Sequence, residues 1–159
     1  MKFSAQEEYG LRCLVRLAHA GEGASLTIGE LSELEGISAP NVAKIMRLLR
    51  RGGFVKSTRG QAGGYSLSRP PSLLVVGDVV GVLGGRLYDA RFCDRHSGLG
   101  KACARLTDCS LRPVWQQVQE VVDDVLGRLT IASLLRREED SSTRRPVRGI
   151  PLPVRMRTA

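Results

Sequence analysis

Three of the four cysteines in this 159-residue chain lie in one short stretch, as Cys93, Cys103 and Cys109. Thiolates are strong ligands for zinc and for iron-sulfur clusters, and the glycines at 98 and 100 allow the backbone to bring them together. Zinc ribbons use paired Cys-x-x-Cys turns, which this chain lacks. The spacing therefore favours a mixed-ligand metal site, completed by a carboxylate or a histidine from another part of the chain.

Other interpretations of these thiols stay open on the sequence alone. They could be free buried cysteines, a disulfide with one spare thiol, or a zinc site that uses His96. Cys13 is different, because it lies beside Leu14 in a helical pattern typical of a small buried hydrophobe. The missing Cys-x-x-Cys motif also argues against a thiol-redox enzyme, and we expect no catalytic activity.

The charge of the chain is concentrated where a polyanion could bind. The formal net charge is +8, and the segment from Gly36 to Gly77 contains no acidic residue at all. Such a block is typical of a surface that faces nucleic acid. Its basic residues are Lys44, Arg47, Arg50, Arg51, Lys56, Arg59 and Arg69.

The elements around this block predict a winged helix-turn-helix over residues 1–83. Apolar spacing predicts a helix over 5–20, then a second that starts in a Thr27-x-x-Glu30 capping box and ends at Gly36. A third helix, capped by Ser38, should end at Gly52-Gly53, followed by strands 54–57 and 65–68. The fold class is thus mostly α with a small β-hairpin wing.

The third helix is predicted to be the recognition helix, which enters the major groove N-terminus first. Its first residues should approach bases, its later arginines should meet phosphates, and the wing tip suits the minor groove. The predicted DNA-binding residues are Ser38, Asn41, Lys44, Arg47, Arg51, Arg59, Gly60 and Gln61.

The C-terminal half is expected to contain three parts. Residues 84–110 form a cysteine-rich loop, here called the cysteine loop, and residues 111–137 form a long dimerisation helix with apolar residues at coiled-coil spacing. Residues 138–159 lack periodicity and are expected to be a disordered basic tail. Without a membrane span or a secretory signal, the protein is expected in the cytoplasm. The apolar positions of the helix are Leu111, Val114, Val118, Val121, Val125 and Leu129.

From Met1 to about Leu135 the chain resembles the IscR and NsrR family of winged-helix iron-sulfur regulators. The resemblance lies in the start Met1-Lys2-Phe3-Ser4, the segment Gly36-Ile37-Ser38, the wing sequence of residues 59–65 and the cysteine loop. It implies a homodimer that grips a palindromic operator in double-stranded DNA, with a cluster beside the dimer helix. In some members of the family an acidic residue at the position of Glu8 reaches the cluster from the partner subunit, so Glu8 is the implied fourth ligand.

The sequence departs from the family pattern at two points. The first cysteine gap is nine residues, and Arg112 stands where IscR-like proteins have a histidine ligand. A histidine-ligated cluster is therefore not expected, and a 2Fe-2S cluster is favoured over 4Fe-4S. The prediction is a repressor that senses cluster status, redox state or nitric oxide. The alternative is a cluster-independent winged-helix regulator that responds to a small molecule or a partner protein.

Overall fold

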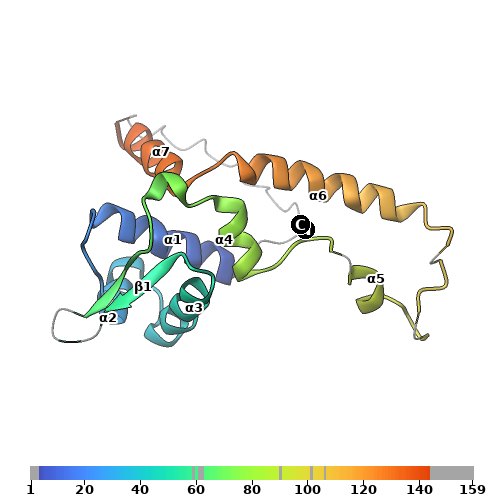
Figure 1. Cartoon of the computed structure of the whole chain (residues 1–159), viewed down its shortest axis with the longest axis horizontal. Coiled ribbons are helices and arrows are strands. Elements are labelled where there is room, and N and C mark those ends of the chain that lie inside the picture. The colour runs from blue at the N-terminus through green and yellow to red at the C-terminus, as the bar shows by residue number, and fades with distance from the viewer. Residues whose placement is uncertain are drawn as a thin grey trace, which may run out of the picture.

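The computed structural model describes residues 4–58, 60, 63–89, 91–100, 102–105 and 107–143. Figure 1 shows a helical N-terminal unit from which one long helix, α6, extends together with the cysteine loop. The elements are α1 (Ala5–His19), α2 (Ile28–Glu35), α3 (Ala39–Arg51), β1 (Val55–Thr58), β2 (Gly64–Leu67), the 3-10 turn η1 (Pro71–Leu73), α4 (Val76–Leu83), α5 (Phe92–Arg95), α6 (Leu111–Gly127) and α7 (Ile131–Thr143).

Local signals set the ends of the first helices. Thr27 and Glu30 form the predicted capping box at the start of α2, with the Thr27 backbone N–H donating to the Glu30 carboxylate at 2.7 Å. The α2 helix ends at Gly36, whose φ of 64° is a left-handed conformation that glycine adopts without strain. The capping box thus fixes the start of α2, and Gly36 fixes the start of the short turn between α2 and α3.

The wing is an antiparallel hairpin, as predicted. The first strand lies one residue later in the sequence than predicted, and the second lies one residue earlier. Val55 pairs with Leu67 and Thr58 pairs with Gly64. A bridge between Leu26 and Tyr65 adds the α1–α2 connection to the other edge of β2. The hairpin is therefore joined to the helices by backbone hydrogen bonds as well as by packing.

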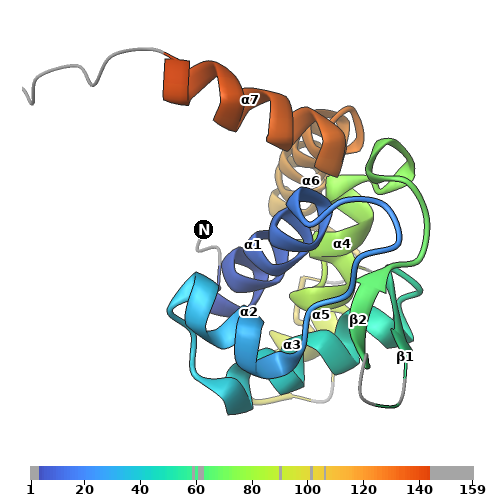
Figure 2. The ribbon, with the colours of Figure 1, turned by 90° about the vertical axis from the view of Figure 1, so that its left-hand side faces the viewer.

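A single apolar core holds α1, α2, α3 and α4 together, and η1 and α7 close one side of it (Figure 2). Cys13 is fully buried in this core, as expected from its helical position. The largest fully buried side chains are Leu14, Leu17, Leu31, Met46, Leu49, Leu74 and Ile131.

The C-terminal helix differs from the expectation of one helix over 111–137. It ends at Gly127, and α7 then packs against α1, so that residues 138–143 are helical and not part of a disordered tail. The break is fixed by residues distant in sequence, because Thr130 pairs with Val75 and the Ile131 N–H donates to the Leu74 carbonyl at 2.9 Å. Residues 144–159 lie outside the described residues.

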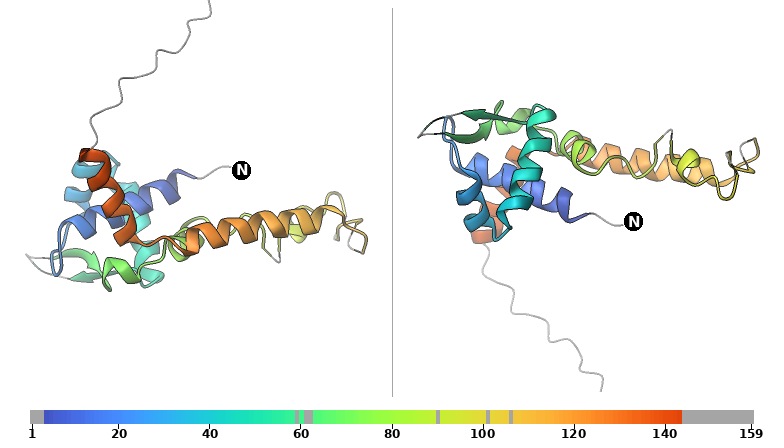
Figure 3. Two further views of the ribbon diagram at one scale, coloured as in Figure 1. Left: turned by 90° about the horizontal axis from the view of Figure 1, so that it is seen from above. Right: turned by 90° about the horizontal axis from the view of Figure 1, so that it is seen from below.

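The direction of α6 decides where the cysteines lie. The views in Figure 3 show α6 projecting from the N-terminal unit, with α5 beside its far half.

Among the residues that the structure describes, no helix is long and apolar enough to cross a membrane.

Candidate nucleic-acid interface and metal centre

One face of α3 carries the predicted recognition residues, and the opposite face is in the core. Val42, Ile45, Met46 and Leu49 are buried. On the other face, polar residues spaced three or four positions apart are exposed to solvent, as a recognition helix requires. These exposed residues are Ser38, Asn41, Lys44, Arg47 and Arg51.

The first turn of α3 leaves its polar groups available for a ligand. Ser38 occupies the N-cap position, but its side chain makes no capping hydrogen bond, contrary to the expectation that it caps the helix. Pro40 lies within this first turn and has no N–H of its own. A helix N-terminus favours anions, so the backbone amides of this turn suit a DNA phosphate, while the Ser38 hydroxyl is not used for capping.

The structure describes only part of the wing tip. Gly60 has a φ of 108°, which a residue with a side chain rarely adopts, and therefore marks a tight turn between the strands. Arg59 and Gln61, both predicted to contact DNA, lie outside the described residues. Arg50 of α3 donates to the Ser57 hydroxyl at 3.2 Å, which links the recognition helix to β1.

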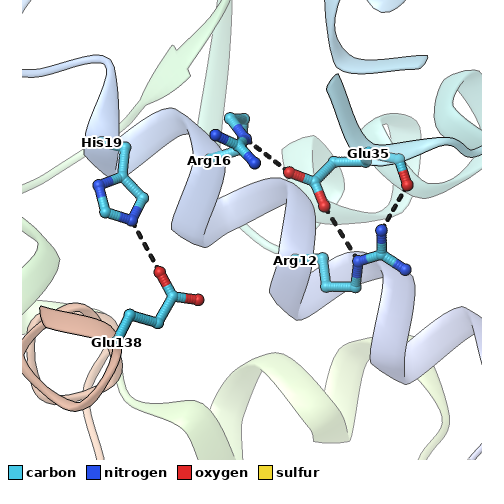
Figure 4. Close-up of polar contacts among 5 residues, drawn as sticks. All are labelled: Arg12, Arg16, His19, Glu35 and Glu138. Carbon is cyan, nitrogen blue, oxygen red and sulfur yellow. Dashed lines mark hydrogen bonds and ion pairs between the residues drawn. The ribbon is translucent and has the colours of Figure 1, made fainter. Parts of the chain in front are cut away.

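A cluster of charges that the sequence analysis missed orients α2 on α1. The Glu35 carboxylate accepts from Arg12 Nε at 3.0 Å and from Arg16 Nε at 2.6 Å (Figure 4). Arg12 also donates to the Glu35 backbone carbonyl. The only sequence signal was the i, i+4 spacing of the two arginines, which places them on one face of α1.

The three cysteines of the loop are free thiols and half-buried, with Cys93 in the short helix α5. The Tyr88 phenol lies near Cys93, Cys109 and Arg112. Desolvation and then the neighbouring Cys93 raise the pKa of Tyr88 above its usual value. Two of the three predicted ligands, Cys93 and Cys109, therefore share one neighbourhood.

The chemical nature of the three thiols and of their neighbours suits a metal centre. An open groove of about 590 Å³ lies between the loop and α6, and Tyr88, Cys93 and Arg112 line it. Soft thiolates beside a cationic guanidinium suit an iron-sulfur cluster, which carries negative charge. Within the described residues, no three Cys, His, Asp or Glu side chains are already arranged to hold a metal ion.

The two candidate fourth ligands lie in different places. Glu8 is exposed on the first turns of α1, whereas α5 lies along the far half of α6, away from α1 (Figure 3). His96 stacks on Phe92, and its Nδ1 lies 2.8 Å from the Phe92 carbonyl. The structure thus brings neither Glu8 nor His96 together with the three thiols in one chain.

One side of α6 is apolar and faces solvent. Leu111 and four valines on this side are 37–59% exposed, although this spacing on a helix normally indicates packing against a partner. The exposed stripe of α6 comprises Leu111, Val114, Val118, Val121 and Val125.

Another side of α6 holds the start of the cysteine loop, by contacts that the sequence did not predict. Gln119 is 5% exposed, and its Oε1 accepts the Tyr88 backbone N–H at 2.9 Å. Its Nε2 donates to Asp123 at 2.7 Å, and Asp123 forms an ion pair with Arg86. These contacts connect four residues, Arg86, Tyr88, Gln119 and Asp123.

A recognition helix with an exposed basic face, followed by a hairpin wing, defines the class of the protein as a winged-helix DNA-binding regulator. The family model "Rrf2: Iron-dependent Transcriptional regulator" matches residues 3–137, and the chain therefore belongs to the Rrf2 family. The protein is accordingly a DNA-binding transcriptional regulator, and its relatives are regulators, not enzymes.

Two curated relatives cover most of this chain. The protein rrf2 of Nitratidesulfovibrio vulgaris is 31% identical over 136 residues, which are 86% of this chain and 88% of the relative. An HTH-type transcriptional regulator of Mycobacterium tuberculosis is also 31% identical, over 84% of this chain and 81% of its own.

Solved structures confirm the fold. T. potens IscR has a TM-score of 0.71 at 29% identity, covering 91% of this chain and 93% of its own. CymR, described as the global cysteine regulator of B. subtilis, has a TM-score of 0.69 at 25% identity, covering 86% of this chain and 98% of its own. The predicted winged-helix fold and the resemblance to IscR-like regulators are both confirmed.

Proposed function

We propose that this regulator is a homodimeric repressor whose affinity for a palindromic operator depends on an iron-sulfur cluster. The observation that carries the proposal is the position of three half-buried free thiols on a loop that leads directly into α6, the helix with the exposed apolar stripe. Because the loop that carries the thiols continues into the dimer helix, a change at the thiols can alter the relative positions of the two DNA-binding units. Because its target is chromosomal DNA, the protein is expected to act in the cytoplasm.

The dimer rests on the exposed stripe of α6. A helix that presents apolar side chains at coiled-coil spacing buries them against a second copy at a gain of about 25 cal/mol per Å². A two-fold dimer also matches a palindrome, because its two recognition helices then meet equivalent half-sites about one helical turn apart.

The cluster ligands are Cys93, Cys103 and Cys109, with Glu8 of the partner subunit as the fourth. Glu8 is exposed on α1, and α5 lies beside the far half of α6, away from α1, which favours a contribution across the dimer. A bound cluster would supply redox chemistry and sensitivity to oxidants and nitric oxide, and a carboxylate ligand would leave one position open to exchange. A 2Fe-2S cluster is favoured over 4Fe-4S.

The DNA contacts divide into two groups. Ser38, Asn41 and Lys44 near the start of α3 read bases, with Asn41 suited to adenine and Lys44 to guanine or phosphate. Arg47 and Arg51 further along meet phosphates, and the wing residues Arg59, Gly60 and Gln61 reach the minor groove.

A second candidate function is a winged-helix regulator that works without a cluster and answers to a small molecule or a partner protein. It is favoured by the likeness to CymR, described as a cysteine regulator, and by the separation of the thiols from a fourth ligand in the described residues. Substituting all three loop cysteines by serine distinguishes the cluster-dependent function from the cluster-independent one. Unchanged operator affinity and unchanged response to oxidants would support the second function.

Anaerobic reconstitution tests the first function. Full-length protein loaded with iron and sulfide should become coloured and contain iron and acid-labile sulfide in equal amounts, and Mössbauer spectra should identify the cluster type. The triple serine variant is the control. Colourless wild-type protein without sulfide would exclude the sensor.

A further inference from the structure

A buried polar side chain on α6 connects the start of the cysteine loop to the helix at its end. Gln119 is 5% exposed. A buried side-chain amide is normally hydrogen-bonded, and both ends of the Gln119 amide are. Its Oε1 accepts the Tyr88 N–H at 2.9 Å, five residues before Cys93. Its Nε2 is held by Asp123 at 2.7 Å, and this bond fixes which side of the amide faces Tyr88.

The other end of the loop is joined to the same helix by the chain itself. Ser110 leads directly into Leu111, the first residue of α6. Gln119 lies eight residues further on, which is about 12 Å along a helix that rises about 1.5 Å per residue. Both ends of the segment from Tyr88 to Ser110 are therefore attached to the first half of α6, and Cys93 and Cys109, the thiols closest in sequence to these two ends, both lie near Tyr88.

The segment before Tyr88 is also fixed, to the helix that carries Glu8. Gln6 of α1 donates to the carbonyl of Leu83, the last residue of α4. A Cβ atom at Gly84 would collide with the Glu7 carboxylate, so the chain passes against α1 at this glycine. The path from the DNA-binding unit to the thiols is thus attached first to α1 and then to α6.

We propose that Gln119 is the positioning residue of the cysteine loop: its amide fixes the segment that carries Cys93 onto α6 and so links the state of the thiols to the dimer helix. The meaning of this role for sensing rests on the proposed function, whereas the attachment is made by protein atoms alone and can be measured without a cluster. Gln119 would bind neither metal nor DNA, because it acts through the Tyr88 backbone.

Amide hydrogen exchange of the full-length, metal-free protein tests the attachment directly. Gln119→Met keeps the length of the side chain and removes the acceptor, so the Tyr88 amide should exchange about fivefold to a hundredfold faster, as expected for the loss of one buried hydrogen bond. Alkylation of Cys93 by iodoacetamide should accelerate as well. Gln116→Met is the matched control, because Gln116 lines the same groove but is exposed, and both rates should match wild type.

Cys13 serves as an internal control for unfolding. It is fully buried in the core, so it should stay unmodified while Cys93 reacts faster in the variant. If Gln119→Met unfolds the protein, Gln119→Glu combined with Asp123→Asn decides, because this pair reverses the donor and acceptor and keeps an oxygen for Tyr88. Tyr88 exchange near the wild-type rate in the double variant supports the proposal.

Two results would overturn the proposal. One is wild-type exchange at Tyr88 in folded Gln119→Met, and the other is exchange in the double variant as fast as in Gln119→Met. A failure of the proposed function would look different, because wild-type protein would then take up no iron and sulfide whatever the exchange rates are.

Discussion

Arg16 of α1 donates to the Glu35 carboxylate at 2.6 Å, and Glu35 is the last residue of α2, four residues before the recognition helix begins. The Glu35 side chain is 8% exposed, so its charge depends on Arg16 and Arg12 for compensation. The first half of the helix-turn-helix is therefore held to α1 by charge as well as by apolar packing (Figure 4).

Removing this carboxylate should destabilise the DNA-binding unit. Glu35→Ala leaves two arginines without their shared partner, and we expect a loss of about 1–2 kcal/mol, less than for a fully buried pair because the arginines are partly exposed. Thermal unfolding measures it as a drop of a few degrees. Glu33→Ala, exposed on the same helix, should leave the midpoint unchanged, and an equal drop in both variants would contradict the role of Glu35.

A charge on the exposed stripe of α6 should separate the proposed dimer. Val121 is 59% exposed in the single chain, and Val121→Glu would place a carboxylate in the middle of the proposed interface. Sedimentation velocity should then find monomers at micromolar concentrations where wild type is dimeric. Gln116→Glu introduces the same charge elsewhere on the helix and should remain dimeric. A dimeric Val121→Glu variant would place the interface elsewhere.

Two substitutions on α3 should affect operator binding in different ways. Asn41→Ala should cost about 1–3 kcal/mol on the preferred operator and relax the choice of base at one position of each half-site. Arg47→Ala should weaken binding to all sequences alike and reduce the salt slope by about one. Binding to an operator library at several salt concentrations measures both, and identical profiles for the two variants would contradict this docking.

Mixed dimers test whether Glu8 acts across the interface. A subunit with Glu8→Ala keeps its three cysteines, and a subunit with Cys93→Ser keeps its Glu8. If the partner subunit supplies the carboxylate, a heterodimer of the two has one intact site, and its iron content should be about half that of wild type. If Glu8 served its own chain, every site in the heterodimer would lack a ligand, and iron content should match that of the two mutant homodimers.

The buried thiol of Cys13 predicts a loss of stability at alkaline pH. Burial raises the pKa of Cys13 from 9.0 to about 11, so between these values the unfolded chain releases a proton that the folded chain keeps. The contribution to stability is complete below pH 9 and disappears as the pH rises to 11. Urea unfolding at pH 8 and pH 10 measures it, and Cys13→Ala should lose less stability over this range than wild type.

The parts of the fold that were predictable are those with local causes. The capping box of Thr27 and Glu30, the stop at Gly36 and the apolar face of α3 can each be recognised within a few residues. The end of α6 could not, because the pairing of Thr130 with Val75 joins segments 55 residues apart.

The candidate site was predictable to a similar extent. Residue type and spacing identified the three cysteines and the basic face of α3. Gln119 carried no such signal, because its importance comes from the Tyr88 backbone N–H, and any residue type could provide that group. Glu35 was missed for a related reason, since its partners lie on another helix.

The central claim is that the cysteine loop controls DNA binding through a cluster. The most direct measurement is anaerobic operator binding by one preparation, before and after its iron is removed, with iron and sulfide quantified in each sample and the triple serine variant alongside. We predict that removing iron changes operator affinity at least about tenfold, or by about 1.4 kcal/mol, in wild type and not in the variant. Equal affinities for the loaded and iron-free wild-type protein would contradict the claim.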